Sequence, residues 1–262
     1  LHYRNKSQYP VGADGAIGFY RARSHQVVPV KRCLIQPEAA DKTAAAVGEW
    51  MRRYKVPAYD EATGKGLVRH VYVRVNLKGE SLCCVVINGR QAPREPELAA
   101  YVCATVPHTA GVLVNSNTKR GNVILGEKYR TLWGRDYLMD TLCGLEFKLS
   151  VPSFYQVNRD QAEALYGKAL DYAGLTGRET VLDLYCGIGT ITLCLAKRAG
   201  RVIGAEIVPA AIRDAKENAA RNHIENAEFF CGDAAETAAR LEAEGLRPDV
   251  ITVDPPRKGL AP

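Results

Sequence analysis

Residues 183–190 read DLYCGIGT, and the apolar run ITLCLAK follows at residues 191–197. These letters predict a strand that ends near an acidic residue, then a glycine turn, then a helix. Gly187 and Gly189 allow a tight turn, and neither carries a Cβ that would block a ligand. Glu206 ends the next apolar run, 201–206, about 20 positions after the glycines. A carboxylate at that spacing is typical of a ribose contact on a doubly wound α/β sheet.

Two further predicted strands are also followed by an acidic residue. Asp233 comes shortly after the run AEFF at 227–230, and Asp254 comes directly after VITV at 250–253. Strands that alternate with helices run parallel, so their carboxyl ends share the sheet edge at which ligands bind. A single acidic residue there would be weak support. Four in order, with Asp183 and Glu206, predict a site for a nucleoside-type cofactor.

The glycine turn also indicates which cofactor binds. A dinucleotide fingerprint has a third glycine, but here Gly189 is followed by TIT at 190–192. Asp183 would also place negative charge where a pyrophosphate needs neutral or positive surroundings. S-adenosylmethionine carries a sulfonium and an ammonium group, which suit an acidic site. The sequence therefore favours a methyltransferase over a dehydrogenase.

Composition and cysteine usage narrow the class of protein. The 262 residues are 47% hydrophobic, which suits a packed globular protein. No run of 18 apolar residues and no signal-peptide pattern occurs, so we expect a soluble cytoplasmic protein without a membrane partner. The eight cysteines are scattered and include no C-x-x-C pair. They indicate a reducing compartment and no self-sufficient metal site.

Charge divides unevenly along the chain. Residues 1–150 contain 22 Lys and Arg against 13 Asp and Glu, a net of +9, whereas residues 151–262 contain 13 against 16, a net of −3. A basic half is typical of a surface that binds a polyanion. A solvated surface would also carry lysine and arginine, but we favour contact with nucleic acid.

Hydrophobic patterning predicts two domains. Residues 1–150 should form a basic α+β domain, and residues 151–262 should begin a Rossmann-like α/β domain after a bridging helix at 159–174. In the first domain we expect hairpins, helices and strands at these positions: hairpins over 1–35, helices at 37–54 and 95–106, strands at 67–75, 81–87 and 111–116, and further strands within 121–150.

Five motifs together resemble the RNA uracil-C5 methyltransferases, which make 5-methyluridine in 23S ribosomal RNA or transfer RNA. They are YRNK at 3–6, SFYQVN at 153–158, DLYCGIG at 183–189, GAE at 204–206 and DPPRKG at 254–259. The resemblance covers essentially the whole chain, and the F-x-Q-V-N and D-P-P-R elements are specific to the family. The basic first domain, with its Arg69-His70 strand, resembles the bacterial 23S rRNA branch more than the tRNA branch.

The resemblance implies roles for individual residues. Gln156 would contact both the cofactor and the target base, and Tyr185, Glu206 and Asp254 would bind the cofactor. Phe154 would pack against a uracil flipped out of its helix, although core packing of Phe154 and Tyr155 is the plainer alternative. The further cofactor-binding candidates are Asp183, Gly187, Gly189 and Asp233.

Catalytic groups are expected outside these residues. In the family a cysteine thiolate adds to C6 of uracil, C5 then attacks the sulfonium methyl, and a base removes the C5 proton. That cysteine lies in a motif after D-P-P-R, whereas this sequence stops at Pro262. Cys186 stands in the glycine turn, where the family does not place the attacking thiol. We therefore expect an incomplete methyltransferase domain that is inactive by itself and monomeric.

One cysteine and two alternative functions remain to be tested. Many family members hold an iron–sulfur cluster, a [4Fe-4S] centre, whose fourth ligand matches Cys33. An adenine or cytosine amino-methyltransferase would need an aromatic residue after D-P-P, where this chain has Arg257. A non-catalytic RNA-binding module with a vestigial cofactor fold is the other alternative.

Overall fold

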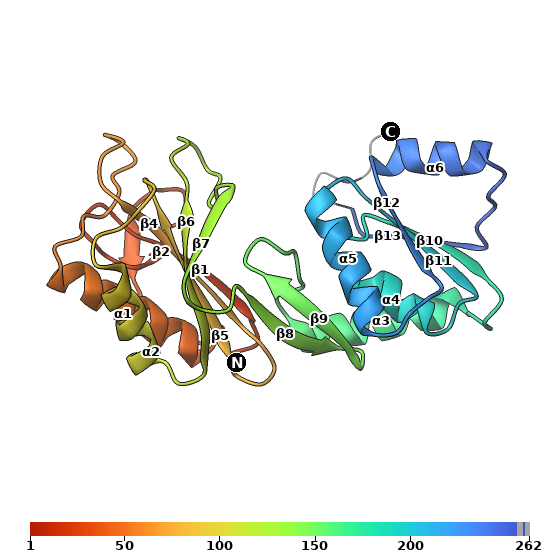
Figure 1. Cartoon of the computed structure of the whole chain (residues 1–262), viewed down its shortest axis with the longest axis horizontal. Coiled ribbons are helices and arrows are strands. Elements are labelled where there is room, and N and C mark those ends of the chain that lie inside the picture. Colours follow the sequence, from red (N-terminus) through yellow and green to blue (C-terminus); the bar gives the residue numbers. More distant parts are fainter. Residues whose placement is uncertain (256–258, 260–262) are drawn as a thin grey trace. The chain divides into compact units, whose positions relative to one another are not determined.

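The computed structural model describes residues 1–255 and 259, and these form two compact units (Figure 1). The first unit comprises Leu1–Leu138 with Ser150–Pro152, and the second comprises Met139–Leu149 with Ser153–Pro262. On these bounds the first unit carries 21 basic against 11 acidic residues, and the second 14 against 18. The basic character thus lies in the first unit, with a net charge of +10, against −4 for the second.

A five-stranded sheet organises the first unit, with strand order β1-β4-β5-β6-β7. The β5–β6 pair is parallel and the other pairs are antiparallel. A separate hairpin is formed by β2 and β3. The elements are β1 (Lys6–Pro10), β2 (Gly18–Tyr20), β3 (Val27–Pro29), α1 (Glu38–Arg53), β4 (Val68–Val75), β5 (Ser81–Ile87), α2 (Glu95–Thr105), β6 (Thr109–Ser116) and β7 (Lys128–Gly134).

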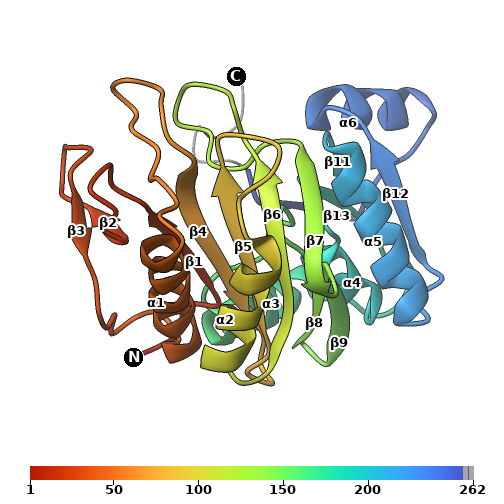
Figure 2. The same ribbon diagram turned by 60° about the vertical axis from the view of Figure 1, so that its left-hand side comes forward.

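Both helices of the first unit cover the same face of its sheet. Figure 2 shows α1 and α2 side by side against the strands, and their apolar side chains share one core with alternate residues of β4, β5 and β6. Trp50 of α1 is fully buried in that core, and its Nε1 donates to the carbonyl of Arg94 at 3.0 Å. The period-two alternation of β4 explains this, because Val71 and Val73 face the helices while Tyr72 packs on the other face.

Sequence patterning predicted the positions of these elements within a few residues, but it did not predict every strand pairing. The first strand, β1, does not pair within the expected N-terminal hairpins; it lies antiparallel to β4, with Lys6 opposite Arg74. Pairing between segments more than 60 residues apart leaves no local signal in the sequence.

The second unit contains a hairpin followed by alternating strands and helices. The elements are β8 (Tyr137–Leu142), β9 (Leu145–Ser150), α3 (Arg159–Ala173), β10 (Thr180–Leu184), α4 (Thr190–Ala196), β11 (Arg201–Glu206), α5 (Pro209–Arg221), β12 (Ala227–Cys231), α6 (Ala234–Ala243) and β13 (Val250–Val253). Four of the strands form a parallel sheet in the order β12-β11-β10-β13.

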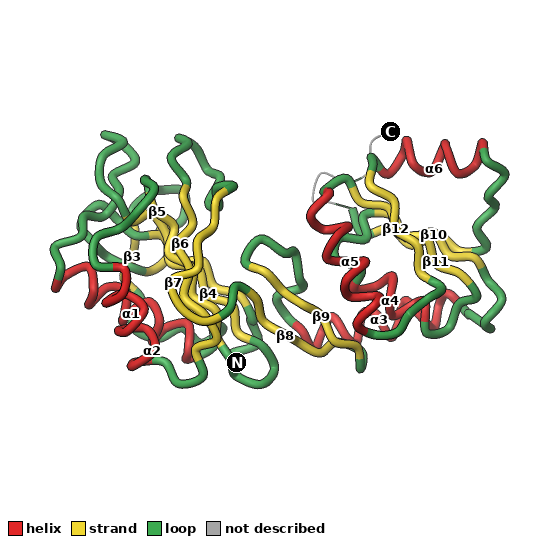
Figure 3. Tube along the Cα trace, in the orientation of Figure 1, coloured by secondary structure: helices red, strands yellow, loops and turns green. Residues whose placement is uncertain are grey.

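Helices cover both faces of this parallel sheet (Figure 3). Apolar residues of α3, α4 and α5 pack with Val181 and Val202 on one face, and Leu241 of α6 packs with Leu182 and Ile203 on the other. The strand order reverses at β10, since β11 lies on one side of it and β13 on the other. Ligands of doubly wound sheets bind at such a switch point, beyond the carboxyl ends of the strands.

The boundary between the units differs from the one expected at residue 150. Residues 139–149 group with the second unit, because Leu142, Phe147 and Leu149 pack into the core beneath the parallel sheet. The backbone amides of Glu146 and Lys148 in β9 also donate to the side chains of Asn222 and Asn218, at 2.8 and 2.9 Å. Asn218 lies in α5, and Asn222 is the C-cap residue of that helix. Among the helices that the structure describes, none has both the length and the apolar character to span a membrane.

Candidate functional site

The glycine turn after β10 has the left-handed geometry that its sequence predicts. Gly187 and Gly189 have φ angles of +57° and +83°. A Cβ added at Gly187 would meet no atom within 4 Å, so the turn is open to a ligand at that point. Gly189 is different, because an added Cβ would lie 3.3 Å from Ala215 and from the Phe229 ring. Gly187 therefore leaves an open approach, while Gly189 lets α4 begin close to its neighbours.

Tyr185 precedes the glycines and shares their unusual backbone. Its φ is +65°, a region that costs a residue with a Cβ free energy and that clusters at functional sites. The side chain is partly exposed. Tyr185 directly follows β10 and so lies at the carboxyl edge of the sheet, where the sequence predicted a cofactor contact.

Glu206 ends β11 beside the same turn. Its carboxylate accepts hydrogen bonds from the backbone amides of Gly187, at 3.2 Å, and Val208, at 2.9 Å. These two bonds fix the carboxylate at the carboxyl edge of the sheet and leave further lone pairs free for a hydroxyl donor. The neighbouring Gly204 cannot carry a side chain, because a Cβ would lie 2.9 Å from Phe229 and 3.0 Å from the Cys186 sulfur.

Asp183 plays a different part from the one its position suggests. Its side chain is buried, and its two oxygens accept hydrogen bonds from Thr192, at 2.5 Å, and Thr252, at 2.8 Å. Burial, aided by the charge of Asp254, raises the pKa of Asp183 to about 6 despite both hydroxyls. These contacts link β10 to α4 and β13, so Asp183 supports the turn from below.

Gln156 and Asp254 come together although 98 residues separate them. The Gln156 Nε2 donates to the Asp254 Oδ2 at 3.4 Å. Asp254 also lines a cavity of about 240 Å³ with Asp183, Thr252 and residues of α3. Tyr166 of α3 lies in this lining, and its hydroxyl is 3.1 Å from that of Thr190 at the start of α4. The S-F-Y-Q segment thus reaches the ligand-binding edge of the sheet.

Two adjacent aromatic residues of that segment have opposite environments. Tyr155 is buried and packs against Phe147, with ring centroids 6.5 Å apart. Phe154 is 64% exposed. Core packing therefore accounts for Tyr155, whereas Phe154 presents a free aromatic face. Ser153 anchors the segment from the other side by donating to Asp214 of α5 at 3.2 Å.

Asp233 and Cys186, in the second unit, have structural roles. Asp233 caps α6 by accepting from the amides of Ala235 and Glu236. Cys186 is buried, and burial together with the carboxylates of Asp183 and Glu206 holds the pKa of its thiol far above the usual range. A thiol in that environment is a poor nucleophile. Cys231 is exposed and lies opposite Glu206 in the β11–β12 register.

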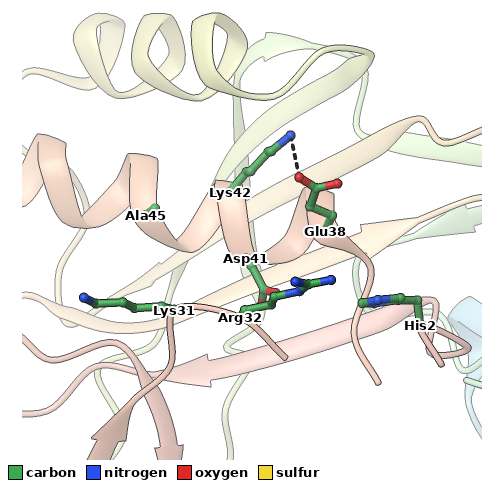
Figure 4. A pocket seen from close by; sticks show the side chains of 7 residues that line it. All are labelled: His2, Lys31, Arg32, Glu38, Asp41, Lys42 and Ala45. Atoms are coloured by element: carbon green, nitrogen blue, oxygen red, sulfur yellow. Dashed lines mark ion pairs between the residues drawn. The ribbon is translucent and has the colours of Figure 1, made fainter. Parts of the chain in front are cut away.

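In the first unit, Cys33 is partly buried, and its amide donates to the Asp41 carboxylate at 2.8 Å. The adjacent cavity, about 500 Å³, is lined by charged side chains and no thiol (Figure 4). Among residues 1–255 and 259, no group of three or more His, Cys, Asp or Glu is placed to hold a metal ion. The described residues therefore do not themselves supply the ligands of an iron–sulfur cluster around Cys33. Of the D-P-P-R-K-G motif, Pro256, Arg257 and Lys258 lie outside the described residues.

Comparison with known proteins shows which class of protein the chain is similar to. Residues 175–255 match the family described as "Methyltransferase domain". The chain is 45% identical over 261 residues to an uncharacterized RNA methyltransferase of Halalkalibacterium halodurans and 43% identical to one of Clostridium acetobutylicum. Each alignment covers 98% of this chain and 57% of the relative. The chain is thus similar to bacterial RNA methyltransferases over nearly its whole length.

A solved structure shares the fold. The tRNA (uracil-54, C5)-methyltransferase of Pyrococcus abyssi, in complex with S-adenosyl-L-homocysteine, matches 100% of this chain and 62% of its own, with a TM-score of 0.81 and 24% identity. The resemblance to RNA methyltransferases and the Rossmann-like methyltransferase fold are thereby confirmed. The chain spans a little more than half the length of the curated relatives that it matches.

Sequence reasoning missed the groups that position the site. Thr192 and Thr252 were not identified, although they hold Asp183. Tyr166 and Asp214 were missed as well, and both lie on helices that flank the candidate site. A polar residue inside an otherwise apolar run, such as Thr192 within ITLCLA, was the one available signal.

Proposed function

We propose that the protein of which this chain is a part transfers a methyl group from S-adenosylmethionine to C5 of a uridine in RNA, with 23S rRNA as the substrate. The observation that carries the proposal is the hydrogen bond between Gln156 and Asp254. It supports the proposal because it joins the F-x-Q-V-N element, which the family resemblance associates with the uracil-C5 enzymes, to the residue that follows β13. Relatives named as RNA methyltransferases support the choice of RNA.

The residues present fit S-adenosylmethionine. Glu206, fixed by two amides, would accept hydrogen bonds from the ribose hydroxyls, and the open approach at Gly187 leaves room for the ligand beside it. Tyr185 would flank the methionine portion, and Asp254 would face its cationic end. When bound, the cofactor supplies an electrophilic methyl group on a sulfonium. Asp183 and Asp233 support the site through the fold, since both carboxylates already hold protein groups.

The target base would lie between Phe154 and Gln156. The exposed Phe154 ring offers a stacking face for a uracil that has left its helix. The Gln156 amide can hydrogen-bond to the edge of the base while it holds Asp254. We further propose that the thiol that adds to C6 belongs to a segment after D-P-P-R, as the family resemblance implies, and that Cys33 contributes to an iron–sulfur cluster.

Cofactor binding is tested by isothermal titration of residues 1–262 with S-adenosylhomocysteine. Glu206→Ala should weaken binding by roughly 1–3 kcal/mol, the usual loss of a hydrogen bond to a charged group. Glu225→Ala is the matched control, because Glu225 is exposed and precedes β12 at the opposite end of the sheet. Equal affinities for the two variants would remove Glu206 from the site.

RNA binding is tested separately with 23S rRNA and tRNA transcripts. Affinity should fall steeply between low and physiological salt, because lysine and arginine release counterions when they neutralise phosphates. Preference for the tRNA would move the protein to the tRNA branch. RNA binding without any cofactor binding by a form extended past Pro262 would instead favour the non-catalytic module.

A further inference from the structure

A second polar cavity lies in the first unit and has no part in the site above. Its volume is about 170 Å³, and it lies between the β2–β3 hairpin, the loop at 59–62 and the start of β4. We call it the β4 cleft. Its lining includes Tyr20, His25, Tyr59, Glu61, Arg69 and His70.

A β-bulge explains why two adjacent residues of β4 line one cavity. Consecutive strand residues normally point to opposite faces. The β4–β5 register shifts between Val68 and His70, and this irregularity lets Arg69 and His70 both reach the β4 cleft. Bulges re-aim side chains in this way and are common next to functional sites.

Arg69 is buried but only partly satisfied. Its side chain is 4% exposed, and its Nη1 donates to the carbonyls of Asn117 and Lys119, both at 2.8 Å. Its Nε has no hydrogen-bond partner among the described residues. The guanidinium lies over the Tyr59 ring, 4.6 Å from the centroid. A buried charged donor without a partner is energetically unfavourable, so a ligand that accepts from Nε would recover that cost.

His70 adds a second unsatisfied atom to the same cleft. It is 7% exposed, and its Nδ1 also lacks a partner within the described part of the chain. Burial, together with the charge of Arg69, lowers the pKa of His70 to about 4, so the ring is neutral at pH 7. A neutral imidazole nitrogen donates or accepts according to its tautomer. The cleft therefore offers Arg69 as a donor and His70 as an adaptable partner.

The rim of the β4 cleft argues against a charged ligand. Glu61 accepts from the Tyr20 hydroxyl at 3.1 Å and pairs with His25 at 2.6 Å. With Asp60 also in the lining, two carboxylates disfavour an anion, and the buried Arg69 disfavours a cation. A neutral ring with carbonyl acceptors fits best.

Size and surroundings narrow the ligand further. A volume of 170 Å³ corresponds to about six water molecules at roughly 30 Å³ each, well below the usual 300–1,000 Å³ of a cofactor pocket. A single six-membered ring fits that space. Tyrosine rings and a guanidinium plane are also the groups on which unpaired bases of RNA stack.

We propose that the β4 cleft takes one unpaired pyrimidine base of the RNA substrate, separate from the base that is methylated. Carbonyl oxygens of the pyrimidine would accept from Arg69 Nε and from His70, and the ring would lie against the aromatic rim. This inference rests on the proposed RNA substrate. On this proposal the first unit binds one unpaired nucleotide in the β4 cleft, in addition to contacting RNA through its basic surface.

The test is binding of residues 1–262 to a fluorescein-labelled oligouridylate and oligoadenylate of equal length, followed by anisotropy. His70→Phe removes the hydrogen-bonding ring, and Ala62→Trp obstructs the cleft while leaving Arg69 and His70 in place. Ala104→Trp, at an exposed position of α2 outside the cleft, is the matched control. We expect both cleft variants to bind oligouridylate roughly ten-fold more weakly, and oligoadenylate unchanged, as the loss of one base contact predicts.

Each outcome of this experiment decides the proposal. Wild-type affinity of Ala62→Trp for oligouridylate, or an equal loss with Ala104→Trp, would overturn the cleft as a base site. If either of these results is obtained while the wild-type protein still binds RNA, the cleft proposal fails but the proposed RNA substrate stands. If it binds neither RNA at low salt, the RNA substrate and the β4 cleft proposal fall together.

Discussion

Asp183 of the second unit and the neighbours Arg69 and His70 of the first unit differ in how completely their buried polar atoms are hydrogen-bonded. In the second unit, Asp183 has both carboxylate oxygens occupied by threonine hydroxyls. In the first unit, Arg69 and His70 are almost as buried, yet each keeps one nitrogen without a partner among the described residues. Full satisfaction marks a group that completes the fold. The unsatisfied nitrogens beside the β4 cleft support the proposal that a ligand completes their contacts. Position at a strand end does not by itself separate these two cases.

The largest expected effect tests whether the two units are stable independently. Trp50→Ala should lower the free energy of unfolding of the first unit by about 3–5 kcal/mol, because it leaves a large cavity and removes the hydrogen bond from the indole Nε1 to the Arg94 carbonyl. Trp133→Ala is the matched control, since Trp133 is 47% exposed. Calorimetric unfolding should show one transition shifted and S-adenosylhomocysteine binding retained. Loss of that binding in Trp50→Ala would show that the units depend on each other.

The second largest expected effect is on the pH dependence of the free energy of unfolding, and it comes from Asp183. Its pKa is raised from 3.8 to about 6 on folding, so the folded state binds the proton more tightly than the unfolded state. The resulting stabilisation is full below about pH 4 and is lost as pH rises through 6. This pKa difference between the unfolded and folded states corresponds to a stabilisation of roughly 3 kcal/mol at most. Asp183→Asn should flatten the stability profile between pH 4 and 7, whereas the exposed Asp171→Asn should leave its slope unchanged. An unchanged slope in Asp183→Asn would show that Asp183 keeps its ordinary pKa.

A smaller effect separates an ion pair whose carboxylate is buried from one in which both side chains are about half exposed. Glu95 of the first unit is buried, pairs with Arg130 through both oxygens at 2.6 Å, and accepts from the Ala92 amide. Glu95→Gln should cost about 1.5–3 kcal/mol, as hydrogen bonds to buried charges do. Its control is Glu228→Gln in the second unit, where the pair with Arg201 is about half exposed and should contribute less than about 1 kcal/mol. Urea unfolding curves that rank the two variants in the opposite order would contradict this comparison.

Sequence and structure agree best where chemistry is local. The glycine turn, the strand ends at Glu206 and Asp254 and the bridging helix ending at Gly174 were all predictable from spacing and turn residues. That Arg69 and His70 line the same cavity was not predictable, because a bulge breaks the period of two on which strand predictions rest. The support of Asp183 by Thr252 was hidden for another reason: the two residues are 69 positions apart and meet only in the folded sheet.

Cys231 lies opposite Glu206 in the β11–β12 register and offers a place to attach a fluorescent probe near the candidate site. Cys231 is the most exposed of the eight cysteines, and the buried ones among them are shielded from thiol reagents. An environment-sensitive fluorophore attached through a maleimide would therefore favour this position over the others. The dye would then lie one strand away from the carboxylate proposed to hold the ribose. The chain thus carries a native attachment point from which ligand entry could be followed optically, without the introduction of a new cysteine.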